Sequence, residues 1–323
     1  MATFPLKPGI EEALARAWEF VGATAPNPPV GAVAWDSEGR ILGVSAHEKA
    51  GQSHAEAGLL QQIHHQGKTP QIHTLFVTLE PCNHTGKTPP CTKAIQDSRV
   101  PRVIYGVSDP NSLVKGGGGN ALKESGVQVQ TLSELGMKEE ELKCRELIRP
   151  WAHRLVKGYP WVVVKQALDP SGSMIPPAGK KTFTSPESLH FAHRLRRQSD
   201  AILTGIGTVL ADRPLFTVRH LQDHAAVRQG KPRILVVMDR HSRTPRDWIQ
   251  KAQENGHDVW IRQELEKTLK ELGEKGLNSI LVEAGPTLTQ AVLNSGFCGQ
   301  HVVIQAQNNG KPDLIQNHVY WNH

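Results

Sequence analysis

The feature that most constrains this chain is a set of three side chains suited to binding one metal ion. His54, Cys82 and Cys91 supply one imidazole and two thiolates. If they share an ion, the segments that carry them must meet in the fold. Three nitrogen and sulfur ligands with an open fourth position are typical of catalytic zinc sites, whereas structural sites usually close that position with another cysteine or histidine. Glu56 lies two residues after the histidine and need not be a ligand, so it is available for proton transfer.

The order of these residues points to one reaction class. A histidine and a glutamate in H-x-E, followed by Pro81-Cys82 and a later cysteine, form the signature of the zinc deaminases. Zinc lowers the pKa of a bound water to about 7, and Glu56 would carry a proton from that water to the leaving amine. Two alternatives stay open. One is a structural zinc site, and the other is a surface histidine with two ordinary buried thiols.

The segments around the ligands have clear patterns. We predict a helix over 54–65, a buried strand over 75–79 that Pro81 ends, and a helix over 91–97. His54 would then lie in the first turn of a helix, and both thiolates would lie at helix N-termini. The helix dipole favours the ionised form of a thiol there.

The rest of the first half predicts a three-layer α/β/α domain. An amphipathic helix over 10–21 precedes two strands that form a hairpin. The further predicted elements are strands over 30–35, 41–46, 102–107 and 127–132 and a helix over 120–125. The glycines 116–119 lack the Lys-Ser/Thr of a phosphate-binding loop, so we predict a flexible turn there.

The chain is predicted to divide near residue 150, into domains 1–150 and 151–323. A helix over 134–157 links them, and the second half alternates strands with helices, which predicts a largely parallel sheet. The predicted strands are 161–168, 201–205, 233–239, 258–262, 279–283 and 301–307, and the predicted helices are 186–197, one from Trp248, 265–275 and one after Pro286. Glu283 to Pro286 would be a strand end, a glycine turn and a helix start whose N–H groups hold a phosphate.

The composition indicates in which compartment the protein acts and what class of partner it binds. No apolar run of the 323 residues approaches the roughly 20 that span a membrane, and the first residues lack an apolar signal core, so we expect a cytoplasmic protein. Cys144 and Cys298 are then expected as reduced thiols. The net charge of +6 suits an anionic partner, but aromatic residues make up only 5% and no basic–aromatic run is present, which favours a phosphorylated small molecule over nucleic acid.

Several longer stretches resemble the RibD family of bacterial riboflavin biosynthesis. Eight residues, 83–90, separate the two cysteines, where most zinc deaminases have two. This stretch, together with 25–33 and 109–114, is similar to the pyrimidine deaminase half of that family. The segments 199–212 and 283–288 are similar to its reductase half, which resembles dihydrofolate reductase. The resemblance implies a cytidine-deaminase-like domain followed by a dihydrofolate-reductase-like α/β domain.

The resemblance also implies two reactions. The first would deaminate 2,5-diamino-6-(5-phosphoribosylamino)pyrimidin-4-one at C2 to give 5-amino-6-(5-phosphoribosylamino)uracil. The second would pass a hydride from NADPH to the ribose C1′. We expect a homo-oligomer, a dimer or tetramer. The implied deaminase substrate residues are Asn27, His84, Lys87 and Thr88; the reductase substrate residues are Lys180, Arg196, Phe216, Arg219 and Glu283; the NADPH residues are Ala167, Thr182, Thr208, Asp212, Gly285, Pro286 and Thr287.

The reductase half departs from the family pattern. Asp169-Pro170-Ser171-Gly172 stands where the family has Ser-x-Asp-Gly, Thr182 stands in place of a tryptophan, and Lys180 stands in place of a serine. The chain also ends soon after the predicted strand 301–307. A deaminase with a degenerate reductase domain, a second domain that serves only as a scaffold, and a tRNA deaminase therefore stay open as alternatives.

Overall fold

The computed structural model describes residues 5–84, 89–111, 117–176, 182–219, 232–307 and 311–320. The chain forms two compact units, residues 1–155 and residues 156–323. The boundary lies within helix α5 (Lys138–Lys157), the segment predicted to link two domains. Within the described residues, no helix has the length and apolar character needed to cross a membrane.

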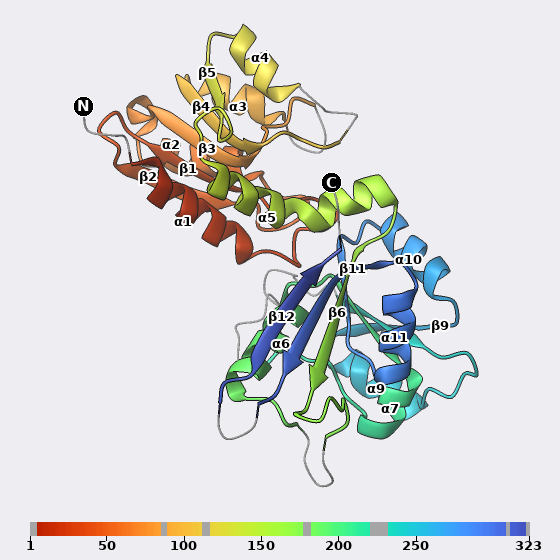
Figure 1. The fold of residues 1–323 in the computed structure, drawn as a ribbon. Helices are drawn as coiled ribbons and strands as arrows, with labels where there is room; N and C mark the ends of the chain where they lie inside the picture. The colour runs from red at the N-terminus through yellow and green to blue at the C-terminus, as the bar shows by residue number, and fades with distance from the viewer. Residues whose placement is uncertain are drawn as a thin grey trace. The chain divides into compact units, whose positions relative to one another are not determined.

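The first unit is built on a five-stranded sheet in the order β2-β1-β3-β4-β5 (Figure 1). Its strands are β1 (Gly31–Trp35), β2 (Ile41–Ala46), β3 (Thr74–Leu79), β4 (Arg102–Val107) and β5 (Gln128–Thr131). β1 pairs antiparallel with both β2 and β3, so the predicted hairpin is confirmed. β3, β4 and β5 are parallel. Every residue of β1 and β3 is buried, which places these strands in the middle of the core.

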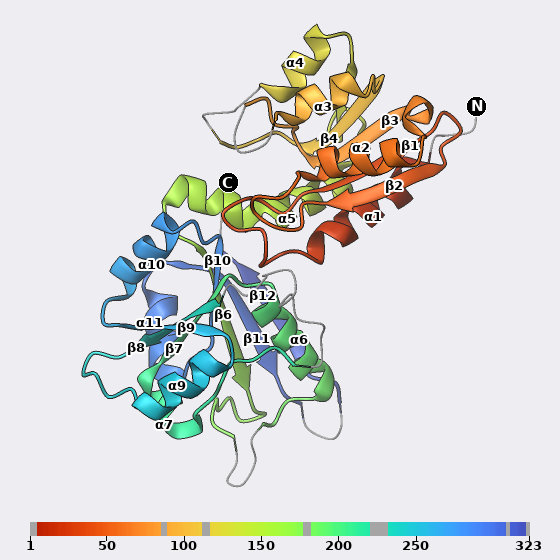
Figure 2. The ribbon, with the colours of Figure 1, turned by 180° about the vertical axis from the view of Figure 1, so that it is seen from behind.

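Helices cover both faces of this sheet, as Figures 1 and 2 show from opposite sides. α1 (Leu6–Trp18) and α5 lie on one face, and α2 (Ala55–His65), α3 (Cys91–Asp97) and α4 (Gly118–Glu124) lie on the other. A short 3-10 helix, Thr69–Gln71, precedes β3. The predicted α/β/α layering is confirmed. α1 begins earlier than the predicted 10–21 because Pro8 falls in its first turn, where proline is tolerated.

The second unit contains a seven-stranded sheet in the order β12-β11-β6-β10-β7-β8-β9. Its strands are β6 (Trp161–Leu168), β7 (Ala201–Gly205), β8 (Arg233–Met238), β9 (His257–Arg262), β10 (Ser279–Val282), β11 (Cys298–Gln305) and β12 (Leu314–Val319). All pairings are parallel except that of β11 with β12. The largely parallel sheet expected from the alternating pattern is therefore present.

Helices also pack on both faces of the second sheet. The helices among its described residues are α6 (Pro186–Arg197), α7 (Ile206–Asp212), α9 (Arg246–Glu254), α10 (Leu265–Glu274) and α11 (Pro286–Asn294). Leu269 of α10 and Val292 of α11 belong to one core cluster. Trp248 of α9 and Val209 of α7 belong to another. Successive side chains of the strands point to opposite faces of the sheet, and helices pack against the apolar side chains of each face.

The structure corrects two predictions. No strand is predicted after 301–307, but β12 follows β11 and continues the sheet as an edge strand whose residues are all exposed. The predicted turn at 116–119 is wrong for Gly118 and Gly119, which are buried at the start of α4. A Cβ at Gly118 would lie 1.7 Å from the carbonyl oxygen of Pro81, so this close approach requires glycine.

Candidate functional site

The three predicted metal ligands converge between β3 and the starts of two helices. His54 is the residue immediately before α2, Cys82 follows β3, and Cys91 is the first residue of α3. The Nδ1 atom of His54 lies 3.5 Å from the sulfur of Cys82 and 3.3 Å from that of Cys91. Their ligand atoms all lie within 4.8 Å of one another. One imidazole and two thiols at this spacing fit zinc with one position open to water or substrate.

The two thiols differ in their surroundings. Cys82 does not begin a helix, contrary to the prediction. Its sulfur instead accepts the backbone N–H of Cys91, 3.3 Å away, at the start of α3. Hydrogen bonding from Cys91, together with that from His54, lowers the pKa of Cys82 to about 4. The hydrogen bond to Cys82 and burial raise the pKa of Cys91. The start of α3 thus stabilises a thiolate at Cys82, as a metal ligand requires.

Glu56 belongs to the same site. It is in the first turn of α2, and only 3% of it is exposed. Burial raises its pKa to about 7. A carboxyl group with a pKa near neutral can both accept and return a proton, which is the requirement for a general acid–base group.

His54, Glu56 and Cys82 line one cavity of about 310 Å³, which Asn27 and His84 also line. Asn27 is held by His47, whose Nε2 lies 3.1 Å from the Asn27 amide nitrogen. The Nδ1 of His47 lies 3.0 Å from the carbonyl oxygen of Ser53. A carbonyl only accepts, so Nδ1 carries the hydrogen and Nε2 accepts from Asn27. Burial also lowers the pKa of His47, which favours this neutral form.

The cavity includes residues that sequence reasoning missed. They are His47, Glu80, Asp109, Asn111, Trp151 and Arg154. Asp109 and Asn111 fall in a stretch that carried the family resemblance, so a signal for them existed. Trp151 and Arg154 fall in the helix interpreted as a linker, where nothing in the sequence marked them. The predicted phosphate donors Lys87 and Thr88 lie outside the described residues.

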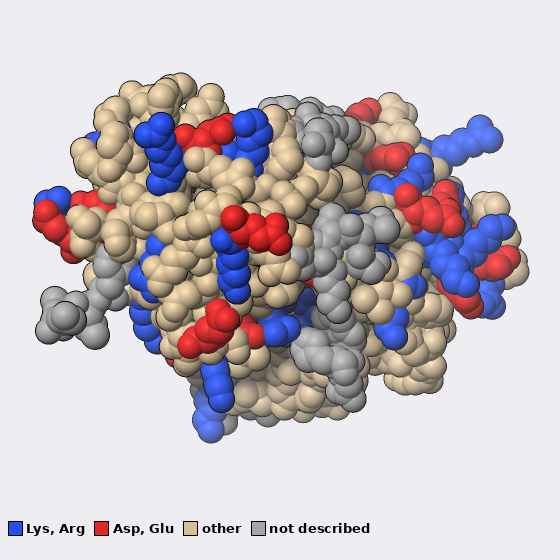
Figure 3. Space-filling view, turned by 90° about the horizontal axis from the view of Figure 1, so that it is seen from above, with Lys and Arg blue, Asp and Glu red and all other residues tan. Residues whose placement is uncertain are grey.

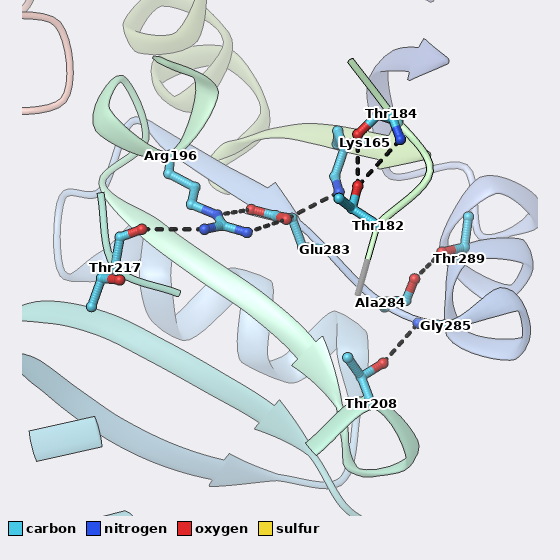
Figure 4. A network of polar contacts seen from close by, with 10 residues as sticks. All are labelled: Lys165, Thr182, Thr184, Arg196, Thr208, Thr217, Glu283, Ala284, Gly285 and Thr289. Carbon is cyan, nitrogen blue, oxygen red and sulfur yellow. Dashed lines mark hydrogen bonds and ion pairs between the residues drawn. The ribbon is translucent and has the colours of Figure 1, made fainter. Parts of the chain in front are cut away.

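In the second unit, a buried carboxylate organises the predicted substrate residues (Figure 4). Glu283 follows β10 and is 6% exposed. Its Oε1 lies 2.5 Å from the Nε of Arg196, and its Oε2 lies 3.1 Å from the Nζ of Lys165. Burial alone would raise the pKa of Glu283, but the charges of Arg196 and Lys165 hold it well below its usual range. Lys165, in the middle of β6, was not identified from the sequence.

The predicted cofactor residues meet at the ends of β7 and β10. The backbone N–H of Gly285 donates to the hydroxyl of Thr208 in α7, 2.9 Å away (Figure 4). Pro286 and Thr287 then open α11, and Ala167 lies near the end of β6. The carboxyl ends of parallel strands beside a helix start are where α/β folds bind phosphorylated ligands.

Other predicted residues are less closely connected to this network. Phe216 is buried with its ring 5.7 Å from the guanidinium carbon of Arg196. Asp212 ends α7 and is exposed. Arg219 is exposed, and its backbone N–H donates to His193. Thr182 contacts the hydroxyl of Thr184 at 3.0 Å. Lys180 lies outside the described residues.

Both halves of the chain match known families. Residues 7–107 match the cytidine and deoxycytidylate deaminase zinc-binding region, and residues 160–306 match the RibD C-terminal domain. The riboflavin biosynthesis protein RibD of Aquifex aeolicus is 35% identical over 317 residues, covering 91% of this chain and 85% of the relative. That of Escherichia coli is 34% identical over 310 residues, covering 87% and 82%.

Two solved structures are similar to this chain over nearly its whole length. RibD of Acinetobacter baumannii has a TM-score of 0.76 at 29% identity and covers 94% of this chain and 88% of its own. A diaminohydroxyphosphoribosylaminopyrimidine deaminase/5-amino-6-(5-phosphoribosylamino)uracil reductase of Thermotoga maritima has a TM-score of 0.79 at 27% identity, covering 95% and 88%. With a zinc-type cavity in one unit and the reductase fold in the other, the chain belongs to the RibD family of bifunctional deaminase/reductases in riboflavin biosynthesis.

Proposed function

We propose that the first unit deaminates 2,5-diamino-6-(5-phosphoribosylamino)pyrimidin-4-one and that the second unit then reduces the ribosyl group of the product to ribityl with NADPH. The observation that carries the first step is the meeting of His54, Cys82 and Cys91. Buried Glu56 lines the same cavity as His54 and Cys82. The matches to RibD over most of the chain support both steps.

The residues of the deaminase site have different proposed roles. His54, Cys82 and Cys91 would hold zinc, which when bound lowers the pKa of water so that it can attack C2. Glu56 accepts the proton from that water and donates it to the departing amine, in keeping with a pKa near 7. Asn27, oriented by His47, positions the pyrimidine ring. His84, with Lys87 and Thr88, is proposed to contact the ribose phosphate.

In the second unit, the protein's task is to place NADPH against the sugar, since the hydride belongs to the cofactor. The N–H groups at the start of α11 and the fixed Gly285 turn suit a cofactor phosphate. The Lys165–Glu283–Arg196 cluster would face the ribose. Asp169, in the altered turn, accepts from the backbone N–H groups of Ser171 and Ser173, so its side chain closes the turn. The turn is thus ordered in spite of the exchanged residues.

A nucleic-acid deaminase is less consistent with the surface. On the described part of the face drawn in Figure 3, Lys and Arg side chains are interspersed with Asp and Glu, and no broad basic surface is visible there. Phosphate backbones are instead bound by continuous basic surfaces.

We also propose that the protein forms a homo-oligomer, either a dimer or a tetramer, and that it acts in the cytoplasm.

The test is to incubate zinc-loaded protein with the diaminopyrimidine ribotide, with and without NADPH, and to identify products by mass spectrometry. A deaminated product that is reduced only with NADPH supports both steps. A product that is deaminated but never reduced refutes the reductase step. If the zinc-loaded protein forms no product, the assignment of the riboflavin-pathway substrate is refuted. The next measurement would then be whether the protein binds RNA in a salt-sensitive way.

A further inference from the structure

Helix α5 forms one wall of the deaminase cavity, although its sequence suggested only a linker. Trp151, Arg154 and Leu155 all line the cavity. Their spacing of three and four residues places them on one face of the helix. Trp151 is only 6% exposed, so a buried side chain anchors this part of the helix beside the cavity. The wall therefore has a fixed position relative to the metal ligands.

Arg154 is distinguished by its charge. Among the described residues that line the cavity, it is the sole lysine or arginine, whereas Glu56, Glu80 and Asp109 are acids. A phosphate monoester carries a charge of about −1.5 to −2 at neutral pH. The acidic side of the cavity repels such a group, and a guanidinium attracts it. The planar fork of arginine also matches phosphate oxygens, which it binds at two points.

The guanidinium of Arg154 is held in place by the protein. One Nη2–H donates to the carbonyl oxygen of Pro26, 2.9 Å away. This bond holds the guanidinium next to the segment that carries Asn27. Pro26 directly precedes Asn27, the residue expected to contact the pyrimidine. The arginine is thus tied to the segment that holds the ring of the substrate.

We propose that Arg154 binds the phosphate of the phosphoribosyl group in the deaminase cavity and makes deamination selective for the phosphorylated substrate. This inference rests on the proposed function of the first unit and adds a residue that discriminates among substrates. Placing the cation on α5 gives the cavity a phosphate contact in addition to those proposed for the loop after Cys82.

The test compares two substrates, the diaminopyrimidine ribotide and its dephosphorylated riboside. Arg154→Met keeps much of the aliphatic stem and removes the charge. It should lower kcat/KM for the ribotide by about 10- to 100-fold, mostly through KM, because a hydrogen bond to a charged group is lost. It should lower kcat/KM for the riboside much less than kcat/KM for the ribotide. Arg154→Lys should fall between, since lysine keeps the charge without the fork.

Lys157→Met is the matched control, since Lys157 is an exposed cation on the same helix and does not line the cavity. It should change neither substrate. Zinc content and melting temperature of each variant report on folding, and Arg154→Lys keeps the test valid if the methionine variant is unstable. An equal loss with both substrates would overturn the proposal, since Arg154 would then act by positioning Pro26 and Asn27.

A binding measurement separates this inference from the proposed function. Titration of zinc-loaded protein with ribose 5-phosphate should show one binding site fewer in Arg154→Met than in the wild type and in Lys157→Met. That result supports the phosphate contact even if the wild type deaminates neither pyrimidine, an outcome that refutes the substrate assignment alone. Identical titrations for all three proteins would overturn the role of Arg154.

Discussion

The carboxylate of Glu283 holds the guanidinium of Arg196 at two points, with Nε 2.5 Å from Oε1 and Nη2 2.9 Å from Oε2. Arg196 also donates to the carbonyl oxygen of Thr217, 3.2 Å away. A substrate phosphate at Arg196 would have to compete with this carboxylate. We therefore expect Arg196 to fix Glu283 and Lys165 in position for the sugar, with phosphate binding as a secondary role at most.

Glu283→Gln should destabilise the protein by about 3–5 kcal/mol at pH 7, because two largely buried cations lose their common partner. The pKa of Glu283 is lowered in the folded state, so its contribution is fully present above the ordinary value of 4.5 and is lost as the pH falls through the lower folded value. Urea unfolding at several pH values should show the difference from wild type shrinking below pH 4.5. A difference that is constant down to pH 3 would contradict the assignment.

Thr208→Val should weaken NADPH binding. The hydroxyl of Thr208 accepts the N–H of Gly285 and so fixes the turn that opens α11. A lost hydrogen bond costs about 1 kcal/mol, which corresponds to roughly a fivefold rise in the Kd for NADPH. Thr208→Ser keeps the hydroxyl and should bind as the wild type does. Fluorescence titration with NADPH gives both values, and equal affinities for valine and serine would exclude this role.

Metal removal should expose one reactive thiol. Without zinc, Cys82 is the thiolate at neutral pH, because its pKa is lowered to about 4. Burial raises the pKa of Cys144 to about 12 and that of Cys298 to about 11, so both should stay protonated and unreactive. Iodoacetamide with peptide mass spectrometry should label Cys82 first in chelator-treated protein and not in zinc-loaded protein. Labelling of Cys144 at the same rate would contradict the prediction.

Glu56→Gln should retain zinc and lose deamination by about 100- to 10,000-fold, since the amide cannot carry the proton. Zinc binding should persist because Glu56 is not among the three converging ligands. Glu124→Gln, an exposed acid in the same unit, is the control and should act as the wild type does. Metal content by mass spectrometry and ammonia release are the two measurements. Normal turnover in the glutamine variant would show that another group moves the proton.

Much of the fold could be predicted because the deciding patterns are local. All residues of the strands β1 and β3 are buried, and all except Thr74 and Thr78 are apolar. Proline or glycine lies near most element ends. The metal set could be predicted because spacing and chemistry together leave few alternatives. His54 and Cys91 each lie at a helix start, where the sequence indicated a boundary.

The missed features depend on contacts between distant segments. Lys165 reads as an ordinary residue of β6, and only the fold shows that Glu283 lies beside it. Arg154 lies in a segment whose sequence pattern predicts a linking helix, and only the fold shows that this residue lines the cavity. β12 was missed because an exposed edge strand lacks a buried face and so has no alternation of polar and apolar residues.

Gly118→Ala should disturb the metal site from outside it. The added Cβ would lie 1.7 Å from the carbonyl oxygen of Pro81, so α4 or the segment carrying Cys82 must move. Gly58→Ala is the matched control, because its Cβ would meet Ser45 only at 3.4 Å and alanine favours a helix interior by about 1 kcal/mol. Zinc affinity by competition with a chelating dye should fall for Gly118→Ala and hold for Gly58→Ala. Equal zinc affinity in the two variants would mean that the contact of α4 with Pro81 does not help to position Cys82.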